Sequence, residues 1–478
     1  MELQLLVSTD AKPEEPSLLI SGKYWSLSTI DHKQQGNIPS FSCISYIWGP
    51  EREPHAFEKG LTMSTHTRPA LEAAIHTGKS DAFWTDVLCV PHQTPSRQAT
   101  LENMGYIYSL ASEVIIVLTA PTFKAIQEMI QLRTLSHDGL IILEQDTWVS
   151  SVWTYQEIVN SKNFYLISES TTDPDMAIDG SEFFSVLGGA MAKWMKENSH
   201  GHFSLYNALP NLSSFQDLMA DWQLSGYLQR SAFLVMSSLD KKSNNDVNNY
   251  FYAMLGAITQ EPSWDATAHN ISDRFMSILE DKNDYSYIYS FAERDDHPSR
   301  LWRPKPWIPS SSEQERGAKD YIAIRPDILR PVLSWHSWGE AQTGYWKDER
   351  FWLDDMISLQ LSGSMESLAK TSITSWIDRP DLLASDDSKI VQATGEAIKM
   401  IGFEGSLVPT IVKEGLVFPV RSIEGKTVRQ VITSSQIRWA MGSPGFIELE
   451  SNTGVVYVPS AFIGSLKDLN TAPVKMGA

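Results

Sequence analysis

The stretch FSCISYIWG, residues 41–49, is a short apolar and aromatic run that ends at a glycine. A run of this length bounded by turn residues is typical of a buried strand. Comparable runs recur at residues 82–90, 113–118 and 163–168. Strands that alternate with helical segments at such intervals predict a parallel sheet with crossover helices.

The segments between these runs have apolar residues at helical spacing. We expect helices over 67–78, 99–111, 122–135 and 146–161, the last capped by Asp146 or Thr147. The stretch GLIILEQ, residues 139–145, is ambiguous between strand and helix.

The pattern changes along the chain and predicts four parts. We expect an N-terminal extension over 1–40, an α/β domain over 41–175, a helical region over 180–296 and a mixed, strand-rich region over 313–478. A proline- and serine-rich stretch, 297–312, separates the last two.

Composition narrows the classes of partner. The net charge is −19 at pH 7, which opposes general binding to nucleic acid or to an anionic membrane. Two cysteines are too few for a disulfide framework and fit a reducing compartment. With no signal peptide and no apolar run of about 20 residues, we expect a cytoplasmic protein without a membrane span. Neither a Gly-x-Gly-x-x-Gly fingerprint nor metal-ligand spacing occurs, so no cofactor or metal is predicted.

A further stretch, VWTYQE at residues 152–157, places Trp153 and Glu157 at i and i+4 of a predicted helix, hence on one face. Gln156 adjoins this pair. The stretch is the third of three ordered blocks, after ISYIWG at 44–49 and the block at 83–118 (FWTDVLCVPHQ, then LENMGYIYSLASEVIIVL).

Together the three blocks resemble the fungal heterokaryon-incompatibility (HET) domain. That family shows a Ser-Tyr-x-Trp-Gly block, a Trp-x-Asp-x-x-Cys-Ile strand followed by a Met-x-x-Ile-Tyr helix, and an Arg-x-Trp-x-x-Gln-Glu block. The family is in turn similar to Toll/interleukin-1 receptor (TIR) domains. The resemblance implies a flavodoxin-like parallel sheet and a role in self/non-self recognition and programmed cell death.

The resemblance also implies a site. In TIR domains that cleave NAD, a glutamate four residues after a tryptophan is catalytic, and Glu157 occupies this position. Such a carboxylate can stabilise the positive charge that develops on the ribose. NAD would then be a substrate, not a cofactor.

Residues at the carboxyl ends of the predicted strands are the candidate substrate contacts, because ligands of parallel sheets bind there. Ser45, Tyr46, Trp48 and Gly49 end the first strand, and Asp86 lies in the second. Aromatic rings can stack on a base, and Arg97 in the following loop can pair with a phosphate. Trp153 and Gln156 complete the candidate set.

Two departures from the family pattern keep alternatives open. Ser151 stands where the family has arginine, and the 91–98 loop lacks the usual acidic pair. The first hypothesis is an NAD glycohydrolase that acts as a homo-oligomer or with a protein partner. The second is a non-catalytic TIR-like interaction module. The third is a repurposed enzyme that acts on another small molecule.

Overall fold

The computed structural model describes residues 2–10, 12–13, 16–31, 38–77, 80–170, 173–198, 208–224, 230–244, 246–259, 270–308, 325–452 and 454–477. The chain forms two compact units whose segments alternate in sequence. The first unit contains Met1–Asn198, Asn211–Tyr227 and Leu255–Thr267; the second contains Ser199–Pro210, Leu228–Met254 and Ala268–Ala478. The division into four parts that the sequence predicts, 1–40, 41–175, 180–296 and 313–478, stays a prediction.

The first unit contains a sheet in the order β10-β9-β8-β4-β7-β1-β3-β2. Its strands are β1 (Glu2–Thr9), β2 (Leu18–Ile20), β3 (Lys23–Asp31), β4 (Ser42–Tyr46), β7 (Ala82–Trp84), β8 (Glu113–Leu118), β9 (Phe164–Ser168) and β10 (Ile178–Asp179). The central strands β7, β4, β8 and β9 are parallel. The predicted parallel sheet is therefore confirmed, and in chain order its parallel strands lie 2-1-3-4.

The edge of the sheet contains a feature that the sequence reading did not predict. Strand β1 pairs antiparallel with both β7 and β3, and β3 pairs with β2. The residues before β4 are thus part of the sheet. Trp25 of β3 is buried and lies 5.5 Å from the ring of Phe83 in β7.

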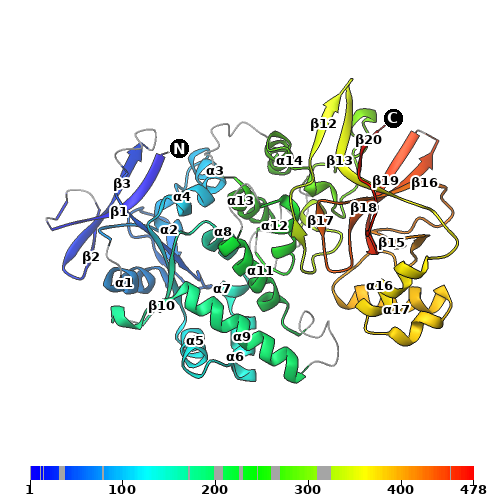
Figure 1. Ribbon diagram of the computed structural model, residues 1–478. Helices are drawn as coiled ribbons and strands as arrows, with labels where there is room; N and C mark the ends of the chain where they lie inside the picture. The colour runs from blue at the N-terminus through cyan, green and yellow to red at the C-terminus, as the bar shows by residue number, and fades with distance from the viewer. Residues whose placement is uncertain are drawn as a thin grey trace. The chain divides into compact units, whose positions relative to one another are not determined.

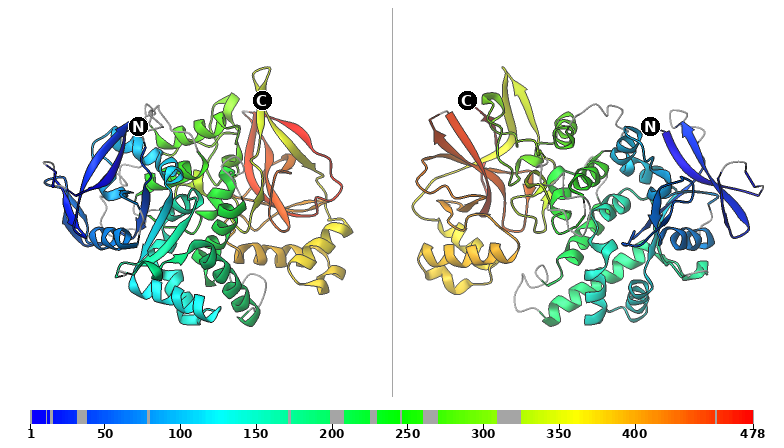
Figure 2. Two further views of the ribbon diagram at one scale, coloured as in Figure 1. Left: turned by 60° about the vertical axis from the view of Figure 1, so that its left-hand side comes forward. Right: turned by 180° about the vertical axis from the view of Figure 1, so that it is seen from behind.

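Most helices of the first unit lie between these strands in the chain, and α9 and α11 follow the last strand (Figure 1). They are α1 (Thr67–Thr77), α2 (Asp86–Cys89), α3 (Ser96–Glu102), α4 (Met104–Leu110), α5 (Ala120–Leu132), α6 (His137–Gln145), α7 (Thr147–Ser150), α8 (Val152–Val159), α9 (Gly180–Asn198) and α11 (Pro210–Leu224). A small hairpin joins β5 (Arg52–Pro54) and β6 (Thr62–Ser64). Figures 1 and 2 show α1 on one side of the sheet and α4 and α8 on the other, as right-handed crossovers require.

Three local expectations are corrected. The run 82–90 is not one strand, because β7 ends at Trp84 and Asp86 begins the short helix α2, where its carboxylate accepts a hydrogen bond from the Val87 N–H. The run 99–111 is split at Asn103 into α3 and α4. The ambiguous stretch 139–145 lies in helix α6, which Ser136 caps.

The predicted helix over 146–161 is broken at Ser151. Asp146 caps α7 by accepting from the Trp148 and Val149 N–H groups. Ser151 then adopts extended backbone (φ −70°, ψ 140°) and its hydroxyl accepts from the Trp153 N–H, so it caps α8. Serine side chains compete for backbone N–H groups in this way, which explains the break.

The second unit is built on an antiparallel sheet in the order β12-β13-β16-β18-β19-β15-β14, with β20 also paired to β13 (Figure 2). The strands of this sheet are β12 (Gly344–Lys347), β13 (Arg350–Leu359), β14 (Thr410–Val412), β15 (Gly415–Pro419), β16 (Val428–Ser434), β18 (Gly442–Ser451), β19 (Gly454–Gly464) and β20 (Ala472–Met476). A separate two-stranded sheet pairs β11 (Trp338–Gly339) with β17 (Ile437–Arg438). The helices of the second unit are α12 (Ala232–Ser238), α14 (Ile271–Asp281), α16 (Ser367–Trp376) and α17 (Asp387–Met400). Helix α13 (Val247–Ile258) begins in the second unit and ends in the first. The expected strand-rich C-terminal region is confirmed.

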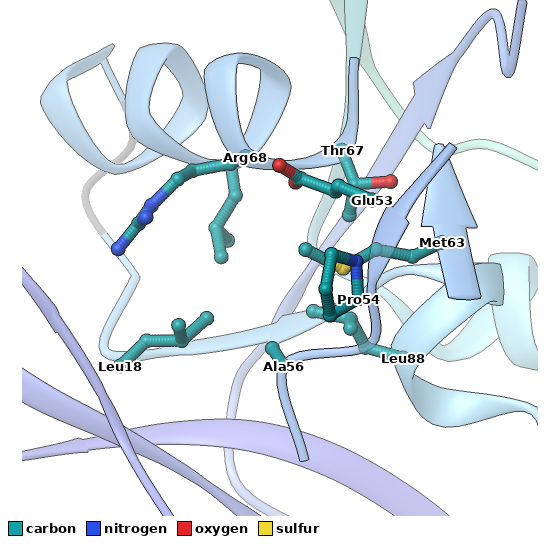
Figure 3. Close-up of a pocket in the computed structure, with 9 residues that line it drawn as sticks. Leu18, Glu53, Pro54, Ala56, Met63, Thr67, Arg68 and Leu88 are labelled. Atoms are coloured by element: carbon teal, nitrogen blue, oxygen red, sulfur yellow. The ribbon is translucent and has the colours of Figure 1, made fainter. Parts of the chain in front are cut away.

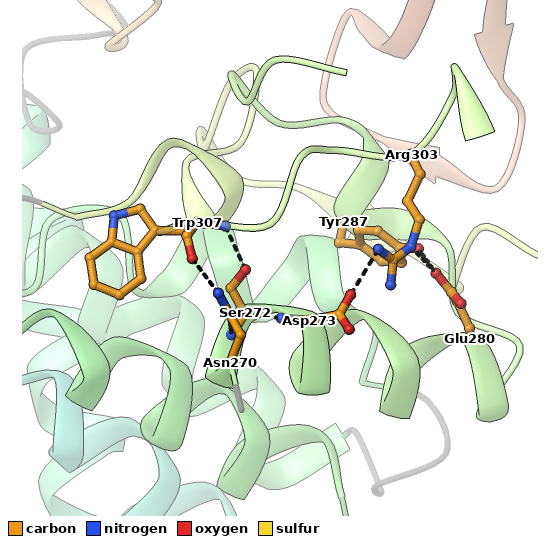
Figure 4. Close-up of polar contacts among 7 residues, drawn as sticks. All are labelled: Asn270, Ser272, Asp273, Glu280, Tyr287, Arg303 and Trp307. Carbon is orange, nitrogen blue, oxygen red and sulfur yellow. Dashed lines mark hydrogen bonds and ion pairs between the residues drawn. The ribbon is translucent and has the colours of Figure 1, made fainter. Parts of the chain in front are cut away.

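The described part of the proline-rich stretch, 297–308, packs on α14 (Figure 4). Arg303 donates to Glu280 at 2.6 Å and to Asp273 at 3.0 Å, and Tyr287 donates to the same Glu280 oxygen. The Trp307 N–H donates to Ser272 at 2.7 Å. This part of the stretch is held by α14, and the remainder, 309–312, lies outside the described residues.

Among the described residues, no helix combines the length and the apolar character needed to cross a bilayer.

Candidate functional site

Ser45 lies at the carboxyl end of β4, where the sheet changes its direction of winding. Strand β4 lies between β7 and β8, with Ser45 beside Ile116 of β8. The chain leaves β4 toward β7 and leaves β8 toward β9, so the connections diverge from this point. A crevice at such a switch point is the usual ligand site of open parallel sheets.

Helix α8 places Glu157 directly against Ser45. The Ser45 hydroxyl donates to Glu157 Oε2 at 2.6 Å, and Trp148 Nε1 donates to Ser45 Oγ at 2.8 Å. Glu157 is 7% exposed and Trp148 is 3% exposed. The three side chains therefore form a buried chain of hydrogen bonds from α7 through β4 to α8.

The environment of Glu157 favours its protonated form. The pKa of Glu157 is raised to about 7, chiefly by burial and also by the negative charge of Asp86, while hydrogen bonds with Ser45 and Tyr108 oppose the shift. A carboxyl group with this pKa is a mixture of acid and carboxylate at neutral pH. It can exchange a proton there, as a general acid or base must.

Asp86 is the second perturbed carboxyl group of this region. Burial raises its pKa to about 6, against hydrogen bonds with the Val87 N–H and Trp48 and the positive charge of Arg97. Trp48 Nε1 donates to both carboxylate oxygens, at 3.2 and 3.0 Å. Trp48 itself is 39% exposed, so this indole forms the solvent-facing side of the cluster.

Tyr46 ends β4, and Trp48 and Gly49 lie in the loop that follows it. The Tyr46 hydroxyl is 2.8 Å from the Thr67 hydroxyl, and burial raises the pKa of Tyr46 well above its ordinary value. Gly49 has φ +59°, and a Cβ there would lie 2.9 Å from the His66 ring. Both the left-handed backbone and the close approach of His66 require glycine at this position.

Arg97 and Trp153, two further candidate residues, do not contact Glu157 or Ser45 through hydrogen bonds between the described residues. Arg97 is half-buried in α3 and acts on Asp86 through its charge. Trp153 is half-exposed on α8, and within the described part of the chain no hydrogen bond or ring contact joins its indole to Ser45, Asp86 or Glu157.

Gln156 points to a different neighbour. Its carboxamide is fully buried against α13, where a Cβ added to Gly256 would lie 1.6 Å from Gln156 Oε1. Asn160 of the same segment donates to the Gly256 carbonyl at 2.7 Å. Gly256 also packs on Gly105 of α4, where an added Cβ would lie 1.8 Å from the Gly256 carbonyl oxygen. Gln156 thus belongs to the contact that fixes α8 against α4 and α13.

Two residues of the cluster were missed from sequence. Trp148 donates to Ser45, and Tyr108 of α4 hydrogen-bonds with Glu157. The sequence predicts both only as positions within helices, Tyr108 in 99–111 and Trp148 in 146–161. Their residue types could have indicated a role in the cluster, because a buried tryptophan or tyrosine usually needs a hydrogen-bond partner for its N–H or hydroxyl group.

A cavity of about 240 Å³ lies beside this cluster, between α1 and the β5–β6 hairpin (Figure 3). Its lining is mostly apolar, with Glu53, Thr67 and Arg68 as polar members; the others are Leu18, Pro54, Ala56, Met63, Leu71 and Leu88. Thr67 is shared with the Tyr46 contact, but Glu157 does not line the cavity. No group of residues suited to hold a metal ion occurs in the described part of the chain.

Residues 41–140 match the family model described as "Heterokaryon incompatibility protein (HET)". Neither the curated proteins nor the solved structures give a significant match. The match spans β4, α1, β7, α4 and β8, including Ser45, Asp86 and Tyr108, and ends before Trp148 and Glu157. Residues 41–140 of the chain are therefore similar to the heterokaryon-incompatibility family.

Proposed function

We propose that this protein acts in self/non-self recognition and programmed cell death, and that Glu157 cleaves the nicotinamide–ribose bond of NAD. The observation that carries the proposal is a pair of carboxyl groups with raised pKa values, Glu157 and Asp86, at the switch point of a parallel sheet. The strand order 2-1-3-4 supports the flavodoxin-like, TIR-like interpretation of this unit.

The chemistry assigned to Glu157 is electrostatic. As the C1′–N bond breaks, nicotinamide leaves with the electron pair and the ribose becomes positively charged. Ionised Glu157 stabilises this charge, and water then adds to C1′ and releases a proton. Ser45 holds the carboxylate by its 2.6 Å hydrogen bond.

This chemistry requires that the ribose of NAD reach Glu157, whose side chain is buried with 7% of the residue exposed. The exposed member of the cluster is Trp48, which Asp86 holds by two hydrogen bonds. In the proposal the loop that contains Trp48 moves when the protein assembles, and the ribose enters beside Ser45. The resting monomer would then be nearly inactive.

The test is nicotinamide release from NAD by the purified full chain, measured at low and high protein concentration. We expect release that rises with assembly and is lost in Glu157→Gln. Glu128→Gln is the matched control, because Glu128 is an exposed glutamate of α5 in the same unit. No release from concentrated protein, or equal release by Glu157→Gln, contradicts the proposal.

The packed contact between Glu157 and Ser45 also favours a second candidate, the non-catalytic interaction module. A carboxyl group that only supports the fold would be buried and bonded in this way. This candidate expects that fungal cells that express Glu157→Gln still die. It also expects that new positive charges at exposed positions of the 91–98 segment, such as Gln93→Arg in the loop and Ser96→Arg at the start of α3, prevent death. Survival of the Glu157→Gln cells would instead support the enzyme.

A further inference from the structure

The cavity between α1 and the β5–β6 hairpin has no part in the chemistry proposed for Glu157, which does not line it. The residues that line the cavity all belong to the first unit, and its volume is about 240 Å³. Sites for drug-sized ligands occupy roughly 300–1,000 Å³. The cavity is therefore suited to a ligand much smaller than a dinucleotide such as NAD.

Most of the cavity lining is aliphatic. Met63 of β6, Leu71 of α1 and Leu88 of α2 line it and are buried, so they form a wall that is shielded from water. Leu18 and Ala56 lie on the side away from α1 in Figure 3. Enclosure by side chains of this kind favours the burial of an aliphatic group of a ligand.

Glu53 of β5 provides an anionic group in this lining. Its Oε1 is shielded from solvent and has no hydrogen-bond partner among the described residues. The adjacent cation, Arg52, donates instead to the carbonyls of Gly49, at 2.7 Å, and Glu51, at 3.0 Å. A shielded carboxylate oxygen without a donor is unfavourable. An ammonium group of a ligand would supply the donor and balance the charge.

Arg68 of α1 provides the opposite charge. Its Nε lies 3.5 Å from Glu72, one turn further along the helix, and both side chains are about half exposed. An exposed pair of this kind is weak, so Glu72 competes little with a ligand carboxylate for Arg68. In Figure 3 the Arg68 guanidinium and the Glu53 carboxylate lie apart from each other, on the α1 side of the cavity. The lining thus combines an aliphatic interior with one anion and one cation.

We propose that this cavity binds a small zwitterion with an aliphatic side chain, the chemistry of an amino acid such as leucine. The ligand ammonium group donates to Glu53, the ligand carboxylate accepts from Arg68, and the aliphatic side chain lies against Leu71 and Leu88. Arg68 would repel an amine without a carboxylate, and Glu53 would repel a carboxylate without an amine. The two charges of the lining therefore select a ligand that contains both.

Equilibrium dialysis of the full chain against radiolabelled L-leucine tests the proposal. Two competitors separate the charges, because isopentylamine is leucine without its carboxylate and isocaproate is leucine without its ammonium group. Glu53→Gln keeps the size of the side chain and removes its charge, Arg68→Gln removes the cation, and Ala56→Leu fills the cavity. Glu128→Gln is the matched control, an exposed glutamate of α5 that does not line the cavity.

We expect saturable binding of L-leucine by the wild type and by Glu128→Gln. Glu53→Gln should weaken the affinity about tenfold, the usual effect of losing one charge-assisted contact. Arg68→Gln should weaken it about threefold, because the contact of a half-exposed charge is weaker. Isocaproate and isopentylamine should compete about tenfold and threefold less well than unlabelled leucine, for the same reasons. Ala56→Leu should abolish binding.

The contrary results are equally direct. No saturable binding, equal affinities of Glu53→Gln and Glu128→Gln, or unchanged binding by Ala56→Leu would overturn the site. Competition by isopentylamine or isocaproate as strong as that by leucine would overturn the requirement for two charges. None of these measurements depends on Glu157 or on nicotinamide release, so the site and the proposed NAD cleavage are tested separately.

Discussion

Ser45 makes two hydrogen bonds with one hydroxyl group, accepting from Trp148 and donating to Glu157. The direction of both bonds follows from the chemistry, because an indole N–H can only donate and an ionised carboxylate can only accept. Ser45 therefore stabilises the carboxylate form of Glu157 against the cost of burial. The balance of these two effects leaves a pKa of about 7.

The first prediction concerns stability against pH. The pKa of Glu157 is raised from 4.5 to about 7 on folding, so the folded protein binds more protons than the unfolded chain between these values. Stability should therefore fall as pH rises through this window, by up to about 3 kcal/mol from this group. Glu157→Gln cannot titrate, so its free energy of unfolding relative to wild type should improve by that amount between pH 4.5 and 8.

Urea denaturation across this pH range measures the effect. Asp86 titrates in both proteins, so only its coupling with the charge of Glu157 remains in the difference. Glu128→Gln, at an exposed glutamate, should follow the wild-type curve. A Glu157→Gln curve parallel to wild type would show that the native Glu157 carboxyl group has an ordinary pKa.

The second prediction concerns Ser45→Ala. The change leaves the Trp148 N–H and the Glu157 carboxyl group buried without this partner, which should cost about 1–3 kcal/mol in the free energy of unfolding. It should also raise the pKa of Glu157. The control is Ser42→Ala in the same strand, where the hydroxyl has one side-chain partner, Glu113, at 3.0 Å. If Ser45→Ala and Ser42→Ala lower the free energy of unfolding equally, the Ser45 hydrogen bonds stabilise the fold no more than the single contact of Ser42.

At the residue scale, the sequence placed Ser45 and Glu157 correctly at the carboxyl edge of the sheet because chain order and strand ends determine that edge. It could not assign Gln156, because adjacent residues of a helix point about 100° apart and the partner of Gln156, Gly256, is distant in sequence. Whether any of these residues contacts a substrate stays a prediction.

At the scale of elements, the strands were the most predictable feature and the helix ends the least. The strand over 113–118 agrees with β8 residue for residue, because β-branched residues fill a strand that is buried along its length. The break between α7 and α8 was missed, because apolar periodicity continues through Ser151 while its side chain ends one helix and caps the next.

The third prediction concerns the contact of α4 with α13. In Gly105→Ala the new Cβ would lie 1.8 Å from the backbone carbonyl of Gly256, so a helix must shift. We expect a loss of about 2–3 kcal/mol or more in the free energy of unfolding. Gly189→Ala in α9 is the control, since no atom lies within 4 Å of its Cβ position and alanine favours the helix. Equal stabilities in a urea titration would contradict this packing.

At the scale of the whole molecule, the chain enters the first compact unit three times. Helix α11 supports the candidate site from outside the predicted α/β domain: Glu144 accepts from the Asn211 and Leu212 N–H groups, and Phe215 packs on Trp148 at 5.5 Å. Sequence pattern could not reveal this interleaving, because no composition change marks where the chain returns. The same limit applies to β1, which lies in the predicted extension yet pairs inside the sheet.

The fourth prediction follows from this interleaving. A fragment of residues 1–175, the predicted extension and α/β domain, lacks α9, α11 and Gly256, and so exposes the apolar surfaces around Trp148 and Phe164. We expect it to aggregate or to lack fixed near-ultraviolet circular dichroism. A fragment of residues 1–259 retains these elements and serves as the comparison. A soluble, cooperatively folded 1–175 fragment would show that the added segments are not needed.

The central claim is that the carboxyl group of Glu157 acts on NAD, and the pH dependence of nicotinamide release by the full chain tests it most directly. The account predicts that kcat/KM rises as pH passes about 7, where Glu157 becomes ionised, and that Glu157→Gln releases no nicotinamide at any pH. Release by Glu157→Gln at the wild-type rate, or no release by concentrated wild-type protein between pH 5 and 9, would contradict it.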